Sequence, residues 1–267
     1  MSQPPTLPAS LRLGPVHLTV ADLDRSVAFY QDAIGLRQHR REDGVAAMGA
    51  GGEDLVVLVE EPGARRPGRN AGLYHFALLY PSREELARAL QRLALARPPI
   101  DGASDHGVSE AIYLPDADGN GIELYADRPR EQWPPPGPGE GVGMFTRALD
   151  LDSLLDLVRR EQPRRHAGEG LRVGHVHLHV GDLEQALGFY QGVLGFDLMT
   201  RYPGALFLSA GGYHHHVGVN TWRGEGVGPA PAGTVGLREW TIVHEEAEDG
   251  ALRRDPWGIA VRLRRGS

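Results

Sequence analysis

The sequence predicts an α+β fold made of four β-α-β-β-β modules in two pairs, the fourth module truncated. Two observations predict it. The text GPVHLTVADLDRSVAFYQDAIGL, which starts at Gly14, returns as GHVHLHVGDLEQALGFYQGVLGF, which starts at Gly174, at a constant offset of 160 residues. A gapless match of this length indicates an internal duplication. Each copy is then followed by short apolar and β-branched segments of the kind that form strands.

In the first module the pattern predicts a strand over residues 16–20 and a helix that begins after Asp22 and ends at Ile34. Asp22 is a typical N-cap residue, and Gly35 is a typical residue just beyond the end of a helix. Further strands are expected in VAAMGA and DLVVLVEE. Residues 1–11 are proline-rich, and we expect them to be disordered.

The other three modules follow the same order. The second starts at Leu73 and has the strand YHFALLY, the helix PSREELARALQRLALA and a last strand in GIELYAD. The third repeats the first and should place strands in ALFLSA and HHHVGVNTW. The fourth follows Gly236 with the strand LREWTIV, little or no helix, and a last strand GIAVRLR. The fourth module is therefore expected to be incomplete.

The region between the two halves has a different composition. Residues 134–143 are rich in proline and glycine, as linkers are, and apolar residues at helical spacing over 149–158 predict one helix after them. We therefore divide the chain into an N-terminal domain of two modules (1–133), a linker with a helix (134–165) and a C-terminal domain (166–267) with the third module and the truncated fourth.

Composition limits the classes of function. The chain has 267 residues, of which 41% are hydrophobic and 24% charged, as expected of a soluble protein with a core. A net charge of -7 argues against nucleic acid or an anionic membrane as the partner. No signal peptide or membrane span is evident, so we expect a cytoplasmic protein. Without cysteine, any metal must be bound by His, Asp or Glu.

Histidines are concentrated in the third module. Of the 12 in the chain, six lie in two clusters, at 175, 177 and 179 and at 214–216. The alternation HVHLH places the first three on one face of a strand. Three imidazoles on a buried face are costly without partners. A metal or a polar cavity would resolve that cost, and so would a place on the protein surface.

Ligand-type residues also recur at corresponding places of the middle modules. The early position of the first strand holds His75 in the second module and His175 in the third. The late position of the last strand holds Glu123 and, counted from the turn glycine, His215. In the outer modules these positions hold Pro15 with Leu55 and Glu239 with Ala260. Two histidines and a carboxylate form the ligand set of non-haem Fe(II) oxygenases, and four such ligands also suit Zn²⁺ or Ni²⁺.

The repeated text V-x-D-L-x-x-(A/S)-x-x-F-Y-x-x-x-(L/I)-G resembles the vicinal-oxygen-chelate superfamily, which includes glyoxalase I, bleomycin-resistance proteins and extradiol dioxygenases. The stretch from Ser104 to Tyr125, with His106, Tyr113 and Glu123, is similar to the extradiol signature. The chain most resembles bacterial catechol-2,3-dioxygenase-like proteins, through YHFALLYPSRE, VSEAIYLPDADGNGIELYADRP and SAGGYHHHVGVNTW. The resemblance implies paired modules that form cup-shaped sheets around a metal. It places the metal ligands at His75, Glu123 and His175.

One departure from the extradiol pattern changes the expected pairing. In the usual extradiol enzymes all three ligands come from the last two modules, whereas the fourth module here has no glutamate at the ligand position. We therefore expect the second and third modules to form the cup that holds the metal. The first and fourth modules would form a second cup without a metal, with His17 as one of its polar residues.

The resemblance implies an Fe(II)-dependent extradiol dioxygenase that cleaves a catechol-type aromatic diol with O₂; Mn, Zn and Ni are the alternative metals. His215 is then the acid/base residue or a fourth ligand. Tyr113 and His106 match a pair that hydrogen-bonds the substrate oxygen and the metal-bound groups. The alternatives are a half-buried strand aromatic for Tyr113 and an ordinary loop residue for His106.

Two other functions fit the sequence. One is a different metal reaction of the superfamily, a glyoxalase-like isomerisation or a thiol transfer, although such sites favour two carboxylates or four ligands and this chain offers one clear carboxylate. The other is a non-catalytic resistance protein that binds aromatic or drug-like molecules, which the shortened fourth module would suit. The sequence leaves the ring substituents, the metal and the oligomeric state open, with a homodimer as one option.

Overall fold

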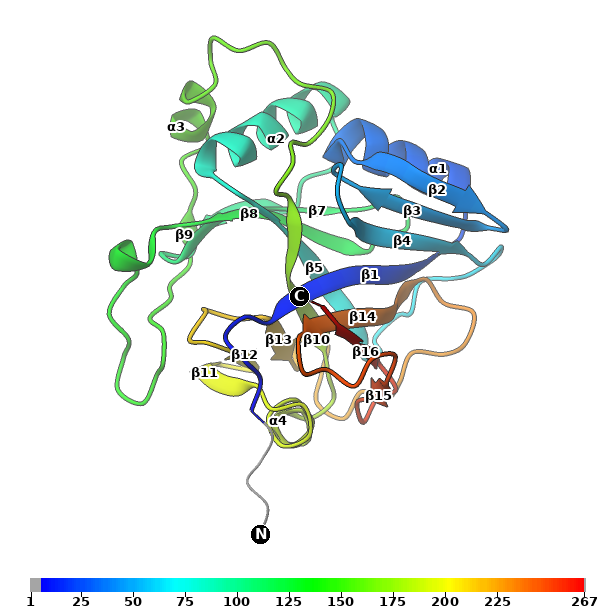
Figure 1. Ribbon diagram of the computed structural model, residues 1–267, viewed down its shortest axis with the longest axis vertical. Coiled ribbons are helices and arrows are strands. Elements are labelled where there is room, and N and C mark those ends of the chain that lie inside the picture. The colour runs from blue at the N-terminus through cyan, green and yellow to red at the C-terminus, as the bar shows by residue number, and fades with distance from the viewer. Residues whose placement is uncertain (1–5, 267) are drawn as a thin grey trace.

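The four predicted modules are present in the structure, a computed structural model that describes residues 6–266 (Figure 1). The first contains β1 (Arg12–Val20), α1 (Leu23–Phe29), the π-helical turn η1 (Tyr30–Ile34), β2 (Arg37–Glu42), β3 (Val45–Gly49) and β4 (Asp54–Glu60). The second contains β5 (Gly72–Tyr80), α2 (Arg83–Ala96), β6 (Gly102–Asp105), β7 (Ser109–Pro115) and β8 (Gly121–Asp127). The third contains β10 (Arg172–His179), α4 (Leu183–Tyr190), β11 (Asp197–Tyr202), β12 (Ala205–Ser209) and β13 (Val217–Asn220).

The fourth module is truncated, as predicted. It consists of β14 (Gly236–His244), β15 (Leu252–Arg254) and β16 (Ala260–Arg265), and the described part of the chain has no helix there. Between the halves lie the 3₁₀ turn η2 (Arg130–Gln132), the short strand β9 (Arg147–Ala148) and the predicted helix, α3 (Leu151–Asp156). None of the described helices is both long and apolar enough to cross a membrane.

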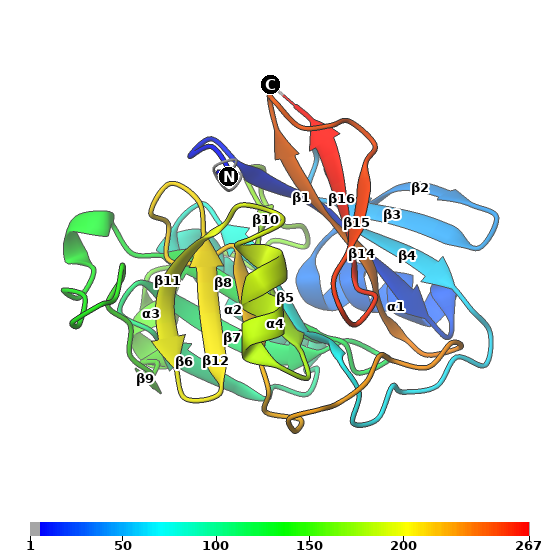
Figure 2. The same ribbon diagram turned by 90° about the horizontal axis from the view of Figure 1, so that it is seen from below.

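Each of the two curled sheets takes modules from both sides of the linker (Figure 2). The seven-stranded sheet has the order β15-β16-β14-β1-β4-β3-β2, and the nine-stranded sheet has the order β11-β12-β13-β10-β5-β8-β7-β6-β9. The expected pairing of the second module with the third, and of the first with the fourth, is therefore confirmed. The division of the chain into two domains at the linker stays a prediction.

The helices begin where the sequence places their caps. The Asp22 carboxylate accepts a hydrogen bond from the Arg25 N–H at 2.9 Å, and Asp182 does the same for Gln185 at 2.8 Å. At the other end of η1, Gly35 has a φ of 85°, a left-handed conformation that favours glycine. The helical segments lie on the outer side of the sheets and bury their apolar faces against them (Figures 1 and 2).

The tyrosine of each repeated Phe-Tyr pair ties two modules together. Tyr30 donates from its hydroxyl to Asp116 at 3.1 Å, and Tyr190 donates to Asp255 at 3.0 Å. Both aspartates sit in the turn before the last strand of the next module in the chain. All four groups are buried, and burial raises the pKa of both carboxyls and both phenols. The duplication thus explains why these tyrosines recur.

The expectation of disorder over residues 1–11 is wrong for the described part, 6–11. Leu7 and Leu11 are buried in the main core, and the Leu7 N–H donates to the Gly195 carbonyl at 3.1 Å. Burial of two leucines stabilises this segment by about 3–6 kcal/mol, which offsets much of the entropy lost on ordering it. Residues 1–5 lie outside the described residues.

Candidate metal centre

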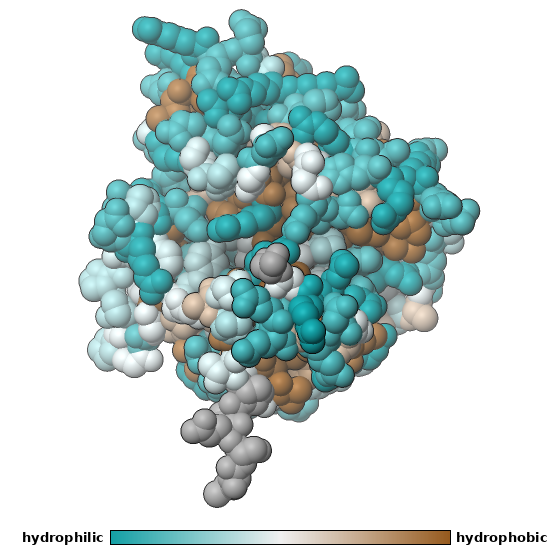
Figure 3. All heavy atoms as spheres, viewed as in Figure 1, coloured by the Kyte–Doolittle hydropathy of each residue, from teal (hydrophilic) through white to brown (hydrophobic). Residues whose placement is uncertain are grey.

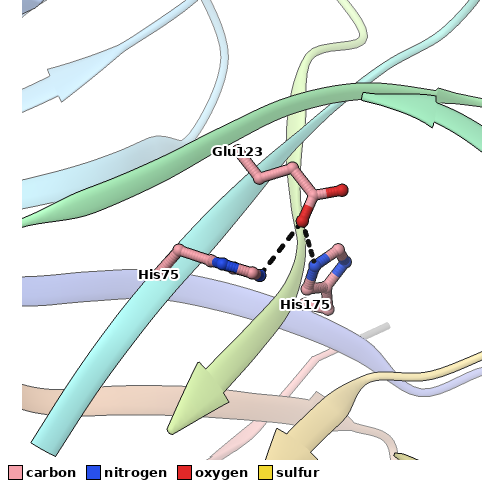
Figure 4. Close-up of side chains that lie close together, drawn as sticks. All are labelled: His75, Glu123 and His175. Carbon is pink, nitrogen blue, oxygen red and sulfur yellow. Dashed lines mark hydrogen bonds and ion pairs between the residues drawn. The ribbon is translucent and has the colours of Figure 1, made fainter. Parts of the chain in front are cut away.

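Three side chains from three neighbouring strands of the nine-stranded sheet converge on one point (Figure 4). His75 comes from β5, Glu123 from β8 and His175 from β10. The Nε2 atoms of both histidines lie 3.0 Å from the same glutamate oxygen, Oε2. One ligand atom from each residue lies within 4.8 Å of the other two. The structure therefore brings together the three residues that the sequence singled out as ligands.

The strand register explains why these side chains meet. His75 pairs with His177 across β5 and β10, and His175 pairs with Ala77, so the two modules are related by an approximate twofold axis between these strands. Glu123 pairs with Ala77 on one side and with Tyr113 on the other. Directly paired residues point to the same face of a sheet. The ligand set thus follows from the pairing of the second and third modules.

The three groups fit a metal ion better than they fit one another. All three are buried, and His175 makes a hydrogen bond to Glu123, but the equally close His75 Nε2 has no hydrogen-bond partner among the described residues. A buried nitrogen without a partner costs about 1–3 kcal/mol. Two ligand atoms at right angles on an ion with bonds of about 2.1 Å are about 3.0 Å apart, and the two nitrogens stand at that distance from the oxygen.

The protonation states suit a metal as well. Burial lowers the pKa of His175, against the opposing pull of Glu123. Burial alone would raise the pKa of Glu123, but the charge and hydrogen bond of His175, with the nearby imidazole of His75, hold it well below its usual range. An ionised carboxylate beside a neutral imidazole is the state in which such side chains bind a metal.

The other two histidines of β10 are satisfied by an amide. The Asn220 side chain donates to Nε2 of His177 at 3.0 Å and accepts from Nδ1 of His179 at 2.7 Å. Burial lowers the pKa of His177 well below its usual value and that of His179 to about 4. The alternation HVHLH therefore marks one residue of the cluster, His175, and two residues held by Asn220, of which His177 lines the cavity. Sequence reasoning missed Asn220. Asn220 lies at the end of β13 and pairs with His179, and this position could have indicated its contact with the histidines.

Tyr113 and His106 form a hydrogen-bonded pair beside Glu123. The Tyr113 hydroxyl lies 2.7 Å from Nε2 of His106, and the Phe145 carbonyl lies 3.0 Å from the other ring nitrogen, Nδ1. Because a carbonyl can only accept, Nδ1 carries the proton in the neutral ring and Nε2 accepts from the Tyr113 hydroxyl. Burial, with the nearby Glu123, raises the pKa of Tyr113 well above its usual value. Phe145, from the linker, therefore sets the tautomer of His106.

His215 lies against His175, with ring centroids 4.1 Å apart, and also lines the cavity in front of the cluster. Asp127 is 2.9 Å from Nε2 of His214, and Nδ1 of His214 is 2.8 Å from Nδ1 of His215. A carboxylate can only accept, so the neutral His214 has its proton on Nε2 and accepts from His215 through Nδ1. The Nε2 atom of a neutral His215 then keeps its lone pair. Burial lowers the pKa of His215 well below its usual value.

The cluster lies at the base of a cavity of about 380 Å³. Its walls are mainly aromatic and apolar, and among the described residues that line it there is no arginine or lysine. Asp101 and Glu123 are the carboxylates of the lining. Tyr74 and Trp222 lie edge to face at 5.5 Å and are both partly exposed at its mouth. Tyr113, Phe145, Tyr202 and Phe207 also line this cavity.

Comparison with known proteins gives the family. The sequence profile of the Glyoxalase/Bleomycin resistance protein/Dioxygenase superfamily matches residues 12–124 and 172–226, more than half of the chain. The chain belongs to this superfamily. The catechol-2,3-dioxygenase of Bacillus subtilis (strain 168) is 45% identical over 249 residues, which cover 91% of this chain and 86% of that protein. The resemblance inferred from the sequence is therefore confirmed.

Solved structures of the superfamily share the fold. A putative dioxygenase from Bacillus subtilis subsp. subtilis str. 168 has a TM-score of 0.59 and 12% identity, covering 94% of this chain and 84% of that one. Glyoxalase I from Zea mays has a TM-score of 0.57 and 18% identity, covering 95% of this chain and 92% of that one. At these identities the two structures establish the superfamily fold alone.

The register corrects which residues occupy equivalent places in the superfamily's modules. Gly218 pairs with His177 as Glu123 pairs with Ala77, so Gly218 is the counterpart of Glu123 in the third module. The sequence-based equivalence of His215 with Glu123 was therefore wrong by three residues, and His215 lies before β13. In the outer cup the counterparts are Arg262 and Val57, not Ala260 and Leu55. The number of residues from the turn aspartate was the signal that sequence reasoning missed. Asp116 stands seven residues before Glu123, and Asp255 stands seven residues before Arg262.

Proposed function

We propose that this protein is a metal-dependent extradiol dioxygenase that cleaves the ring of a catechol-type substrate with O₂. The observation that carries the proposal is the meeting of two histidines and one carboxylate at the base of an aromatic-lined cavity. The 45% identity to a catechol-2,3-dioxygenase supports the same reaction class. One carboxylate, rather than two, argues against a glyoxalase-like isomerase.

His75, Glu123 and His175 would hold the metal. Two neutral nitrogens and one carboxylate on a rigid sheet favour Fe(II), while Mn, Zn and Ni are the competing ions. When bound, the ion would supply a Lewis-acid centre for the vicinal oxygens of the diol and for O₂. The remaining steps belong to the side chains around it.

His215 is proposed as the base for a catechol hydroxyl. Its Nδ1–H is committed to His214, which is in turn held by Asp127, so the free lone pair is on Nε2. The lowered pKa keeps the ring neutral at neutral pH, which is the form that can accept a proton. The pair of Tyr113 and His106 is proposed to position the substrate oxygen next to Glu123. The Tyr113 hydroxyl donates its own proton to a hydrogen bond with His106, so its oxygen is free to accept from the substrate.

The cavity favours a neutral, apolar ring substituent. Its volume of about 380 Å³ is at the lower end of the range of about 300–1,000 Å³ for small-molecule sites and admits a ring with a modest substituent. A carboxylated side chain would meet no cation in the lining and would lie near Asp101 or Glu123. Tyr202, Phe207 and Trp222 instead offer apolar contacts for the far end of the substrate.

Anaerobic reconstitution with Fe(II), followed by addition of catechols and air, tests the proposal. We expect uptake of one O₂ per substrate and a yellow ring-cleavage product, with one iron per chain. Bound iron without O₂ uptake across alkyl-substituted catechols would sink the dioxygenase assignment, and absence of any bound metal would favour a non-catalytic binding protein. Light scattering on the same preparation tests the predicted option of a homodimer.

A further inference from the structure

A second cavity, of about 300 Å³, opens where the two sheets meet. It lies between the first residues of β5 and those of β14, and the turn between β7 and β8 forms one of its walls. Gly72 and Gly236, which start these strands, have φ values of 146° and 138° and therefore bring bare backbone to the cavity. In the space-filling view, hydrophilic residues cover most of the visible face, with smaller apolar patches between them (Figure 3).

Three guanidinium groups line this cavity, those of Arg66, Arg223 and Arg238. Arg66 lies over the β7–β8 turn, with Cζ 3.1 Å from the place where a Cβ of Gly119 would be. In the described part of the chain, Arg66 is exposed and makes no side-chain hydrogen bond or ion pair. The Arg66 guanidinium is therefore available to a ligand in the cavity.

The other two arginines are only weakly balanced. Arg223 is half-buried and donates to the Asn70 carbonyl at 3.1 Å, and no carboxylate of the described residues forms an ion pair with it. Burial lowers the pKa of Arg223, the direction expected of a cation that loses water without gaining an anion. Arg238 donates to the Thr19 hydroxyl at 3.1 Å and lies 3.9 Å from Glu61, a half-exposed and therefore weak pair.

Asp118 is the carboxylate of the cavity lining, and it is already engaged. It accepts from the Ala21 N–H at 3.1 Å and forms an ion pair with Arg25, which lies outside the lining. The cavity thus concentrates positive charge in a chain whose net charge is -7. Such a concentration favours an anion.

We propose that this cavity binds a small oxyanion, a molecule that carries a phosphate or carboxylate group, held by Arg66 and Arg223. Guanidinium groups match both anions because each presents a planar fork of donors to two oxygens. The size of the cavity suits a small metabolite rather than a polymer. Phosphate and carboxylate are the two oxyanion groups that such a site recognises in the same way.

The oxyanion site adjoins the substrate cavity. Leu73 and Arg223 line the former, whereas their chain neighbours Tyr74 and Trp222 line the latter. The two aromatic rings are in edge contact at 5.5 Å. An anion that fixes Arg223 therefore restricts Trp222 at the mouth of the substrate cavity. We expect occupancy to change the fluorescence of Trp222, a signal that is absent from Trp222→Phe.

Equilibrium dialysis of the full chain against inorganic phosphate, and separately against succinate, tests the site at constant ionic strength in chloride. We expect saturable binding of one anion per chain and a loss of at least about tenfold in affinity in Arg66→Gln and in Arg223→Gln. Arg66 has no partner to lose, so Arg66→Gln is expected to fold normally. Arg159→Gln, an exposed residue paired with Asp156 at 3.3 Å, is the charge-matched control.

The comparison of the two anions identifies the source. Saturable binding of phosphate alone, of succinate alone or of both supports the site, provided that Arg66→Gln weakens it and Arg159→Gln does not. Binding that is not saturable, or that is unchanged in Arg66→Gln, overturns the proposal. An anion that binds at the metal centre would be unaffected by Arg66→Gln, because Arg66 does not line that cavity, and would therefore overturn the proposal.

Discussion

Arg262 donates two hydrogen bonds of 2.7 Å to Glu239 in the cup that has no histidine pair. By register, Glu239 is the counterpart of His75 and Arg262 that of Glu123. The counterpart of His175 is Pro15, which is no ligand, and His17, the counterpart of His177, lies 3.8 Å from Glu239. The outer cup thus has the guanidinium group of Arg262 at the place where the other cup has a metal-binding carboxylate. This exchange explains physically why one cup suits a metal and the other does not.

The ion pair of the outer cup should contribute stability and nothing to metal binding. Arg262→Gln leaves the Glu239 carboxylate with His17 alone, and we expect a loss of about 1 kcal/mol of unfolding free energy because the pair is only partly buried. Urea unfolding measures the loss. Arg253→Gln, in an exposed pair with Glu248, is the control and should change stability less. A change in iron content in Arg262→Gln would contradict this assignment.

The metal centre itself is tested by one pair of matched variants. Glu123→Gln removes the anionic ligand. Loss of a hydrogen bond that supports a ligand lowers metal affinity by about 10- to 100-fold, and we expect loss of the ligand itself to lower iron affinity by more than that. Glu239→Gln makes the same change in the outer cup and should leave iron content unaltered. Metal analysis after anaerobic reconstitution provides the measurement. Equal iron content in the two variants would place the metal elsewhere.

Tyr113 and His106 should act as one unit. Because the phenol donates to the imidazole at 2.7 Å, Tyr113→Phe and His106→Phe remove the same interaction. We expect each to lower kcat/KM by about 10- to 100-fold with iron content unchanged, and the double variant to lose little more than either single one. Kinetics of the three variants give the coupling. Fully additive losses would show that the two side chains act separately.

Much of this arrangement was readable from the sequence because it rests on local periodicity and on the repeat. The offset of 160 residues predicted the modules, and the resemblance to the superfamily, with the missing glutamate of the fourth module, predicted their pairing and the residues that meet at the cluster. Positions that depend on loop length were harder. The segment before β13 is longer than its counterpart, so the step from Gly211 to His215 led to the wrong equivalence. Contacts such as Phe145 with His106 join distant segments and leave no periodic signal.

Asp101 should disfavour anionic substrates. It lines the substrate cavity and is exposed. Burial raises the pKa of Tyr74, and the charges of Glu123 and then Asp101 raise it further. Asp101→Asn removes a charge screened by water, so we expect kcat/KM for a carboxylated catechol to rise by about three- to fivefold while that for an alkylcatechol stays constant. Asp32→Asn, also exposed but outside the lining, controls for net charge. An equal gain for both substrates would rule out a charge effect.

Acid should destabilise the metal-free protein through its buried imidazoles, and His216 isolates one of them. Its Nδ1 lies 2.9 Å from the Ser209 hydroxyl and 3.3 Å from the Ala210 N–H, which can only donate, and burial lowers the pKa of His216 to about 3. In the unfolded chain the pKa is about 6.5, so between these values the unfolded state binds one more proton and stability falls as pH falls. The slope from this residue is about 1.4 kcal/mol per pH unit. His216→Asn keeps an acceptor without the titration, and urea unfolding from pH 7 to pH 4 should show a shallower decline by that slope. An unchanged slope would mean that His216 is already charged in the fold.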